Sequence, residues 1–254
     1  MKDGEIAIPP VSGTGAGSPT GQVFNDTTDF PIEGSPAIFI FATLDGTISG
    51  WNGGTSAVIT VKAPTGTAYT GLAIGKSGGA SFLFAADFAN NKVDIYNGTF
   101  KKVGSLKDPK LTGLSVYNVQ NIKGKLYLTF SDGSFSKGAV DIFSTNGKLI
   151  KRLTSNVHLK APWGVALAPK NFGPASNALL VGNVGDGRIS VFNATTGKFM
   201  TQLTNANKKV IAISGLWALA FGEGGGSNGN PNQLFFAAGS NGYADGLFGV
   251  INFK

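Results

Sequence analysis

Apolar residues along the chain gather in short runs rich in Val, Ile, Phe, Leu and Tyr, and Gly, Asn, Asp or Ser separate one run from the next. Strong helix formers are scarce. Nowhere do apolar residues recur at i, i+3, i+4 and i+7 over three turns, the spacing that an amphipathic helix requires. Short β-rich runs between turn residues are typical of strands. The pattern therefore predicts an all-β protein.

The predicted strands repeat along the chain. Five times, a Thr or an aromatic residue leads into a short strand, at 20–24, 70–74, 117–121, 163–167 and 217–221. The repeats thus begin near residues 20, 70, 117, 163 and 217, about 50 residues apart. A period of roughly 40 to 50 residues is the mark of a β-propeller.

Each repeat continues with further strands. Second strands are expected at 38–43, 82–87, 126–131, 179–183 and 234–239, and third strands at 46–51, 91–96, 138–143, 187–192 and 246–251. A fourth, outer strand follows in four repeats, at 57–62, 100–106, 149–153 and 199–203. The turns into these outer strands contain Asn-Gly or Thr-Gly pairs, which suit a tight hairpin with positive φ.

The fifth repeat reaches Phe253 and Lys254 without a fourth strand of its own. The run 5–10 near the N-terminus is the expected donor, because a propeller closed by the other end of its chain leaves no sheet edge unpaired. We therefore predict a single β-propeller domain over residues 1–254, with five four-stranded blades and the N-terminal strand closing the last blade.

Four motifs are specific enough to suggest a family: GSPTGQVFN at 17–25, FATLDGTISGW at 41–51, PWGVALAP at 162–169 and DGLFG at 245–249. With them the chain resembles a family of uncharacterised, exported β-propeller proteins of bacteria and plants. More loosely, it is similar to the NHL-repeat, gluconolactonase and strictosidine-synthase propellers. The resemblance implies relatives with six blades, with an export signal and with a further PWGLA-type repeat, and this sequence contains neither of the last two. It also implies a secreted, extracellular protein.

Composition excludes several kinds of site. The chain has no Cys and one His, His158, so disulfides, thiolate metal sites and sites with several imidazoles are ruled out. No apolar run approaches the roughly 18 to 20 residues of a membrane-spanning helix, so no membrane insertion is expected. The net charge is +7, but the basic residues are scattered and only Arg152 and Arg188 are arginines. Because arginine dominates base recognition, we expect no nucleic-acid partner.

Candidate ligand-binding residues lie at the ends of the second strands, where the blades of a propeller meet its central channel. They are Thr43, Asp87 and Asn183, and Asp87 and Asn183 are also the candidate metal ligands. Oxygen ligands of this kind suit Ca²⁺ in the channel, and the resemblance to gluconolactonase-like propellers implies a catalytic divalent ion there. Asp and Asn are also ordinary turn residues, and the sequence favours turn formation over a metal site. We therefore expect no cofactor, with channel Ca²⁺ as the alternative.

Other residues that could carry chemistry have simpler interpretations. His158 is expected at the surface between two blades. Trp163 and Trp217 begin successive repeats and are expected in the packed interior, although a row of aromatic residues can also stack on a sugar.

The sequence therefore favours a non-enzymatic binding propeller whose glycan, small-molecule or protein ligand sits at the mouth of the channel. One alternative is a hydrolase or lactonase of the gluconolactonase type that depends on a divalent metal. A second alternative is a structural or self-assembling extracellular protein. With only 14 acidic residues, mostly in turns, binding is favoured over catalysis.

Overall fold

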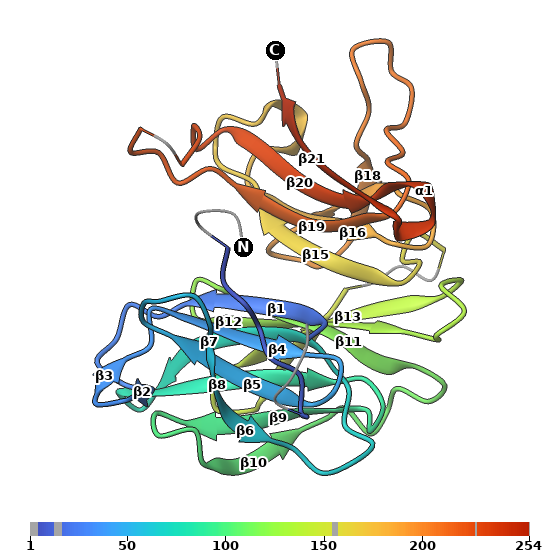
Figure 1. The fold of residues 1–254 in the computed structure, drawn as a ribbon. Helices are drawn as coiled ribbons and strands as arrows, with labels where there is room; N and C mark the ends of the chain where they lie inside the picture. Colours follow the sequence, from blue (N-terminus) through green and yellow to red (C-terminus); the bar gives the residue numbers. More distant parts are fainter. Residues whose placement is uncertain (1–4, 13–16, 154–156, 227, 254) are drawn as a thin grey trace. The chain divides into compact units, whose positions relative to one another are not determined.

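The structure is a computed structural model that describes residues 5–12, 17–153, 157–226 and 228–253 (Figure 1). The chain divides into two compact units, one formed by residues 1–128 and 143–148 and the other by 129–142 and 149–254. The single domain expected from the sequence stays a prediction.

The first unit contains two complete antiparallel sheets. The first sheet has the order β1 (Pro19–Phe24), β4 (Phe39–Thr43), β5 (Thr47–Trp51), β6 (Val58–Lys62). The second consists of β7 (Tyr69–Ser77), β8 (Ala80–Asp87), β9 (Lys92–Asn97) and β10 (Lys102–Leu106), also in sequence order. A small hairpin of β2 (Pro31–Ile32) and β3 (Ser35–Pro36) is inserted between β1 and β4.

A third sheet follows, with the order β11 (Ser115–Ile122), β12 (Lys125–Ser131), β13 (Gly138–Ser144), β14 (Leu149–Arg152). The boundary between the two units runs through this sheet. Its four strands coincide with those predicted for the third repeat.

The second unit contains the last two sheets. The fourth sheet has the order β15 (Pro162–Leu167), β16 (Ala178–Asn183), β17 (Ile189–Asn193), β18 (Phe199–Gln202), and the fifth has β19 (Leu216–Phe221), β20 (Gln233–Gly239), β21 (Asp245–Asn252). The only helical segments in the described residues are the single turns η1 (Gly173–Ala175) and α1 (Ser240–Tyr243). The chain is therefore an all-β, five-bladed β-propeller, as predicted.

Small residues in the innermost strands explain the repeat seen in the sequence. Within the first unit β1 packs against β7 and β7 against β11, and within the second β15 packs against β19. A Cβ atom on Gly21 would lie 2.5 Å from the backbone nitrogen of Leu72, and one on Gly164 would lie 2.7 Å from that of Leu219. Glycine is therefore required where innermost strands approach each other closely.

Each unit has its own apolar core. In the first, Ile40, Ile48 and Leu83 are fully buried with Phe30 and Tyr69 from the connecting segments and strand starts. In the second, a separate cluster joins β16 and β17 to β19 and β20 and includes Leu180, Val191, Leu216 and Leu234. Apolar residues of neighbouring sheets thus pack face to face within each unit.

The predicted closure of the last blade is wrong. Ala7, in the run 5–10, forms an isolated parallel bridge with Ser56, just before β6, through hydrogen bonds of 2.9 Å to Thr55 and Ala57. Pro9 and Pro10 lack N–H donors, so this segment cannot form a full strand ladder. Among the described residues, the last sheet has three strands and β21 is its edge.

Candidate functional site

Thr43, the last residue of β4, is fully buried. Its hydroxyl lies 2.5 Å from Oδ1 of Asp45 and 2.6 Å from the hydroxyl of Thr47, and it accepts the Thr47 N–H at 3.1 Å. Burial raises the pKa of Asp45, but hydrogen bonds from Thr43, from the Val11 N–H and from Thr47 outweigh it, so the pKa lies below its usual value. Thr43 thus braces the turn between β4 and β5.

Asp87 ends β8 and is also fully buried. Its Oδ1 accepts the N–H groups of Ala68 (3.2 Å) and Asn90 (3.3 Å). Its Oδ2 accepts the side-chain amide of Asn90 at 2.8 Å and lies 3.6 Å from Nζ of Lys92. The carboxylate therefore ties the turn after β8 to the connection that precedes β7.

Asn183 occupies the corresponding position at the end of β16 and is fully buried. Its Oδ1 accepts the Lys160 N–H at 3.0 Å, and its amide donates to the carbonyl oxygens of His158 and Arg188, each at 3.2 Å. Asn183 thus links the turn after β16 to the connection that precedes β15.

The structure places Thr43 and Asp87 in the first unit and Asn183 in the second. Each of the three supports a turn, and each does so with the oxygen atoms that a ligand or a metal ion would use. Within the described part of the chain, no three His, Cys, Asp or Glu side chains gather as metal ligands. Ligand binding by Thr43, Asp87 and Asn183, and Ca²⁺ binding by the last two, stay predictions.

A second buried carboxylate belongs to Asp94 in the middle of β9. Its Oδ1 lies 2.7 Å from Nζ of Lys102 and 3.1 Å from Nζ of Lys92, and its Oδ2 accepts the hydroxyl of Tyr69 at 3.1 Å. The Tyr69 and Tyr96 hydroxyls are 2.6 Å apart. Burial, reinforced by these neighbours, raises the pKa of Tyr69. The network therefore holds β7, β9 and β10 together.

The third sheet also has a buried carboxylate paired with a basic residue, at the same point of its third strand. Asp141 is fully buried in β13 and accepts two hydrogen bonds from the guanidinium of Arg152, which ends β14. In the first and fourth sheets, buried Ser49 and Ser190 occupy the equivalent position. Asp94 and Asp141 thus connect the third strand of each sheet to its outer strand, and their role is structural.

His158 is half-buried, and its imidazole stacks on Phe199 of β18 with ring centroids 3.9 Å apart and an interplanar angle of 9°. Its carbonyl oxygen accepts hydrogen bonds from Asn183 and from the hydroxyl of Ser190. The residue therefore packs beside the outer strand of the fourth sheet.

Three aromatic residues form a row within the second unit, two at the start of innermost strands and one in α1. The ring of Trp163 lies 5.4 Å from that of Trp217, which in turn meets Tyr243 edge to face at 6.0 Å. Both tryptophans are half-buried, not fully buried as expected from the sequence, and Tyr243 is 54% exposed. The backbone of Tyr243 has a φ of 70°, which points to a position fixed by its surroundings.

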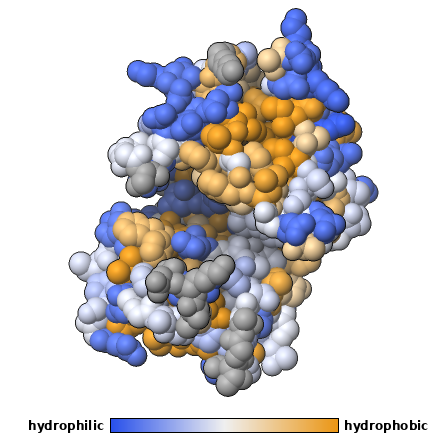
Figure 2. Space-filling model, turned by 45° about the horizontal axis from the view of Figure 1, so that its top comes forward, coloured by the Kyte–Doolittle hydropathy of each residue, from blue (hydrophilic) through white to orange (hydrophobic). Residues whose placement is uncertain are grey.

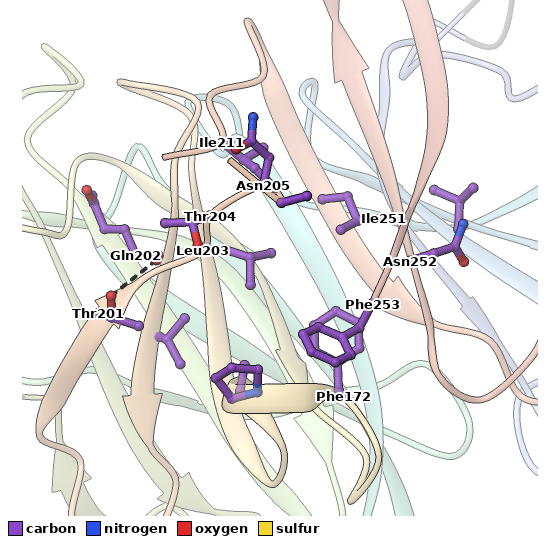
Figure 3. A pocket seen from close by; sticks show the side chains of 15 residues that line it. Phe172, Thr201, Gln202, Leu203, Thr204, Asn205, Ile211, Ile251, Asn252 and Phe253 are labelled. Atoms are coloured by element: carbon purple, nitrogen blue, oxygen red, sulfur yellow. Dashed lines mark hydrogen bonds between the residues drawn. The ribbon is translucent and has the colours of Figure 1, made fainter. Parts of the chain in front are cut away.

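A pocket of about 650 Å³ lies in the second unit, between the end of β18 with the residues that follow it and the end of β21 (Figure 3). Figure 3 shows Thr201 and Gln202 on the β18 side, Ile251 and Asn252 on the β21 side, and Phe172 beside Phe253. The remaining lining is largely aliphatic: Pro174, Ala175, Val191, Leu203, Thr204, Asn205, Ala206, Ile211 and Val250.

The lining of the pocket combines an apolar surface with a few polar groups. None of the described lining residues has a charged side chain; the polar ones are amides and hydroxyls, such as Gln202, Asn205 and Asn252. Its volume falls in the range of roughly 300 to 1,000 Å³ that ligand pockets occupy. Sequence reasoning missed this pocket, because its walls come from two different sheets.

The chain is similar in sequence to two viral proteins. No protein-family model matches the chain. The chain is 31% identical over 225 residues to the uncharacterized protein R640 of Acanthamoeba polyphaga mimivirus, covering 78% of this chain and 41% of that protein. It is 26% identical over 265 residues to the uncharacterized protein R648 of the same virus, covering 92% and 62%. The chain thus spans between 41% and 62% of the length of these two relatives.

Solved structures share the fold at low sequence identity. The nidogen/laminin complex aligns with a TM-score of 0.59 and 14% identity, over 92% of this chain and 80% of that chain. The β-propeller domain of Cps50 (Swd1) from Myceliophteria thermophila aligns with a TM-score of 0.54 and 15% identity, over 89% and 64%. At this identity the likeness establishes the β-propeller fold. None of the helices in the described residues is long and apolar enough to cross a membrane.

Proposed function

We propose that the protein is a non-enzymatic binding propeller and that its ligand occupies the pocket between β18 and β21. The observation that carries the proposal is the uncharged lining of this pocket. General acid–base catalysis needs a titratable group within hydrogen-bond reach of the reacting atom. Amide and hydroxyl groups on an apolar surface can orient a ligand, but their pKa values lie too far from 7 for general acid–base catalysis.

The buried carboxylates favour the same proposal. Asp87, Asp94 and Asp141 are hydrogen-bonded or ion-paired within their own sheets. A hydrolase of the gluconolactonase type would need several such oxygens free to hold a divalent ion. The relation to NHL-repeat and gluconolactonase propellers is therefore proposed for the fold and not for the activity.

The channel mouth, where the sequence placed the ligand, stays a prediction. A second candidate surface is the row formed by Trp163, Trp217 and Tyr243 within the second unit, because flat aromatic faces bind the apolar face of a sugar ring. A glycan is the ligand that this row would suit.

Ligand-observed NMR with a panel of short peptides, oligosaccharides and small apolar molecules tests the proposal. Thr201 is exposed and lines the pocket, whereas Thr196 is exposed and lies outside it. We expect ligands whose binding is lost in Thr201→Trp and kept in Thr196→Trp. Binding lost in Trp217→Ala instead would move the ligand to the aromatic row of the second unit. Lactone or phosphoester hydrolysis that requires added Ca²⁺ and vanishes in Asp87→Ala would replace the proposal with the hydrolase alternative.

A further inference from the structure

Three Asn-x-Thr triplets lie along the chain, at residues 25–27, 97–99 and 193–195. Such triplets are acceptors for N-linked glycosylation, which attaches a bulky, hydrated glycan to the side-chain nitrogen of the asparagine. In a folded protein the attachment requires an asparagine whose Nδ2 atom is accessible and is not needed inside the fold. The three triplets differ in this respect.

Asn25 uses its side-chain amide inside the fold. It is 6% exposed, and its Nδ2 atom donates hydrogen bonds to the carbonyl oxygens of Asp29 at 3.0 Å and Ala37 at 2.8 Å. Its Oδ1 atom accepts the hydroxyl of Thr27 at 2.6 Å. A glycan on Nδ2 would replace one of the two hydrogen atoms of the amide and break a hydrogen bond at a buried position.

Asn97 has the opposite arrangement. It is half-buried at the end of β9, and its Oδ1 atom accepts the N–H groups of Thr99 at 3.1 Å and Lys101 at 2.9 Å. The exposed hydroxyl of Thr99 donates to the same oxygen at 2.9 Å. The Nδ2 atom of Asn97 makes no hydrogen bond to any residue that the structure describes. The turn therefore fixes the amide through its oxygen and leaves its nitrogen available.

Asn193 repeats this arrangement in the fourth sheet. It is half-buried at the end of β17, and its Oδ1 atom accepts the N–H groups of Thr195 at 3.0 Å and Thr196 at 2.8 Å. Its Nδ2 atom has no hydrogen-bond partner in the described part of the chain, and Thr195 is exposed. Asn97 and Asn193 thus occupy equivalent places, in the turns from the third strand to the outer strand.

We infer that Asn97 and Asn193 are acceptor sites for N-linked glycans and that Asn25 is not. In the attachment step the Nδ2 atom displaces the diphosphate from the anomeric carbon of a lipid-linked oligosaccharide. One N–C bond forms and one C–O bond breaks, the lipid diphosphate leaves, and an amide proton passes to a base of the transferase. The step requires that the chain meets this donor, as an exported protein does.

The two acceptor turns lie away from the candidate residues at the ends of the second strands. β9 follows the turn after Asp87 and ends at Asn97, and β17 follows the turn after Asn183 and ends at Asn193. The acceptors are therefore at the opposite ends of these strands from Asp87 and Asn183. Glycans on them would leave the turns of Asp87 and Asn183 uncovered.

Exposed apolar side chains give such glycans a physical role. The outer strands that follow the two turns carry exposed Val103 in β10 and exposed Met200 in β18. Figure 2 shows hydrophobic residues gathered on the second unit, to which Asn193 belongs. Because a glycan is strongly hydrated, it increases the solubility of a surface of this kind.

Secretion of the protein tests the inference. The full chain is placed behind a cleavable export signal, secreted from a eukaryotic cell and purified in its folded form. Its glycans are then removed with an N-glycanase in heavy-oxygen water, which converts each glycosylated asparagine to an isotope-marked aspartate that peptide mass spectrometry locates. We expect the mark at Asn97 and Asn193 and not at Asn25. A mark at Asn25, or no mark at Asn97 and Asn193, would overturn the inference.

Substitutions of the threonines supply matched controls. Thr99→Ala should remove the mark at Asn97 alone, because the hydroxyl of the triplet is lost, whereas Thr99→Ser should keep it. Thr195→Ala and Thr195→Ser should act in the same way on Asn193. Thr27→Ala should leave the pattern of marks unchanged, and a pattern that this variant alters would contradict the exclusion of Asn25.

A second measurement tests whether the fold protects Asn25. The protein without glycans is incubated with UDP-glucose and a soluble transferase that glucosylates Asn-x-Thr triplets, once folded and once as a protease digest. Asn25 should react about tenfold or more slowly in the folded protein than in the digest, because two hydrogen bonds must open. Asn97 and Asn193 should react at similar rates in both. Equal protection of all three asparagines, or protection of none, would overturn the inference.

Discussion

The guanidinium of Arg152 donates two hydrogen bonds to the buried carboxylate of Asp141, 2.7 Å from Nε to Oδ1 and 2.9 Å from Nη2 to Oδ2. The side chain of Asp141 is fully buried and that of Arg152 is 35% exposed. Through this pair the outer strand β14 is fixed to β13.

Arg152→Met should therefore destabilise the protein strongly, because it leaves a buried carboxylate without its guanidinium. Loss of one partner of such a pair typically costs about 3–5 kcal/mol. Arg188→Met is the matched control, since Arg188 is 48% exposed and lies 4.0 Å from Asp186. That change should cost less than about 1 kcal/mol. Urea unfolding measures both, and equal effects would contradict a structural role for Asp141.

Glycines of the innermost strands provide a second prediction. A Cβ atom on Gly71 would clash with the side chain of Asn118, whereas one on Gly104 in β10 would meet nothing within 4 Å. Gly71→Ala should cost about 1–3 kcal/mol through overpacking. Gly104→Ala should be neutral or stabilise by up to about 1 kcal/mol, because it restricts the unfolded chain. Thermal unfolding in which both variants match the parent protein would disprove close packing of β7 on β11.

Local patterns in the sequence predicted most of the strands, because each strand has its own apolar run and its own turn residues. At Gly147 and Gly197 the turns have the expected positive φ values of 88° and 75°. Gly98 is different. Its φ is not in the left-handed region, and a Cβ atom there would lie 2.8 Å from the carboxyl carbon of Asp29. That contact joins residues distant in sequence, so no local pattern could reveal it.

The site was less predictable than the fold for the same reason. The sequence located the ends of the second strands. It could not show that the carboxylate oxygens of Asp87 accept hydrogen bonds from Ala68 and Asn90. The pocket depends on how Leu203 and Ile251, from different sheets, lie opposite each other. The run 5–10 does not close the last blade, because its two prolines lack N–H donors and Ala7 pairs with Ser56 instead.

Deletion of residues 1–11 should have a small effect. Ala7 makes two backbone hydrogen bonds to the first sheet and the Val11 N–H donates to Asp45 at 2.6 Å, so the loss should be below about 3 kcal/mol. The pKa of Asp45 should rise toward its ordinary value once the Val11 donor is gone. Carboxyl NMR titration of Asp45 in both proteins measures this shift.

The sign of the pH dependence follows from the lowered pKa. Asp45 stabilises the folded state fully above its ordinary pKa of 3.8, and this contribution is lost as the pH falls through the lower folded value. The intact protein should therefore exceed the truncated one in stability at neutral pH, and the difference should shrink below pH 3.8. A difference that grows on acidification would contradict the Val11–Asp45 contact.

Amide hydrogen exchange along β18 and β21 tests most directly whether a ligand occupies the pocket between these strands. Saturation with a panel ligand whose binding is lost in Thr201→Trp should slow exchange at the ends of β18 and β21 that line the pocket and leave exchange in the first sheet unchanged. Unaltered exchange in β18 and β21 despite saturating ligand would contradict binding in this pocket.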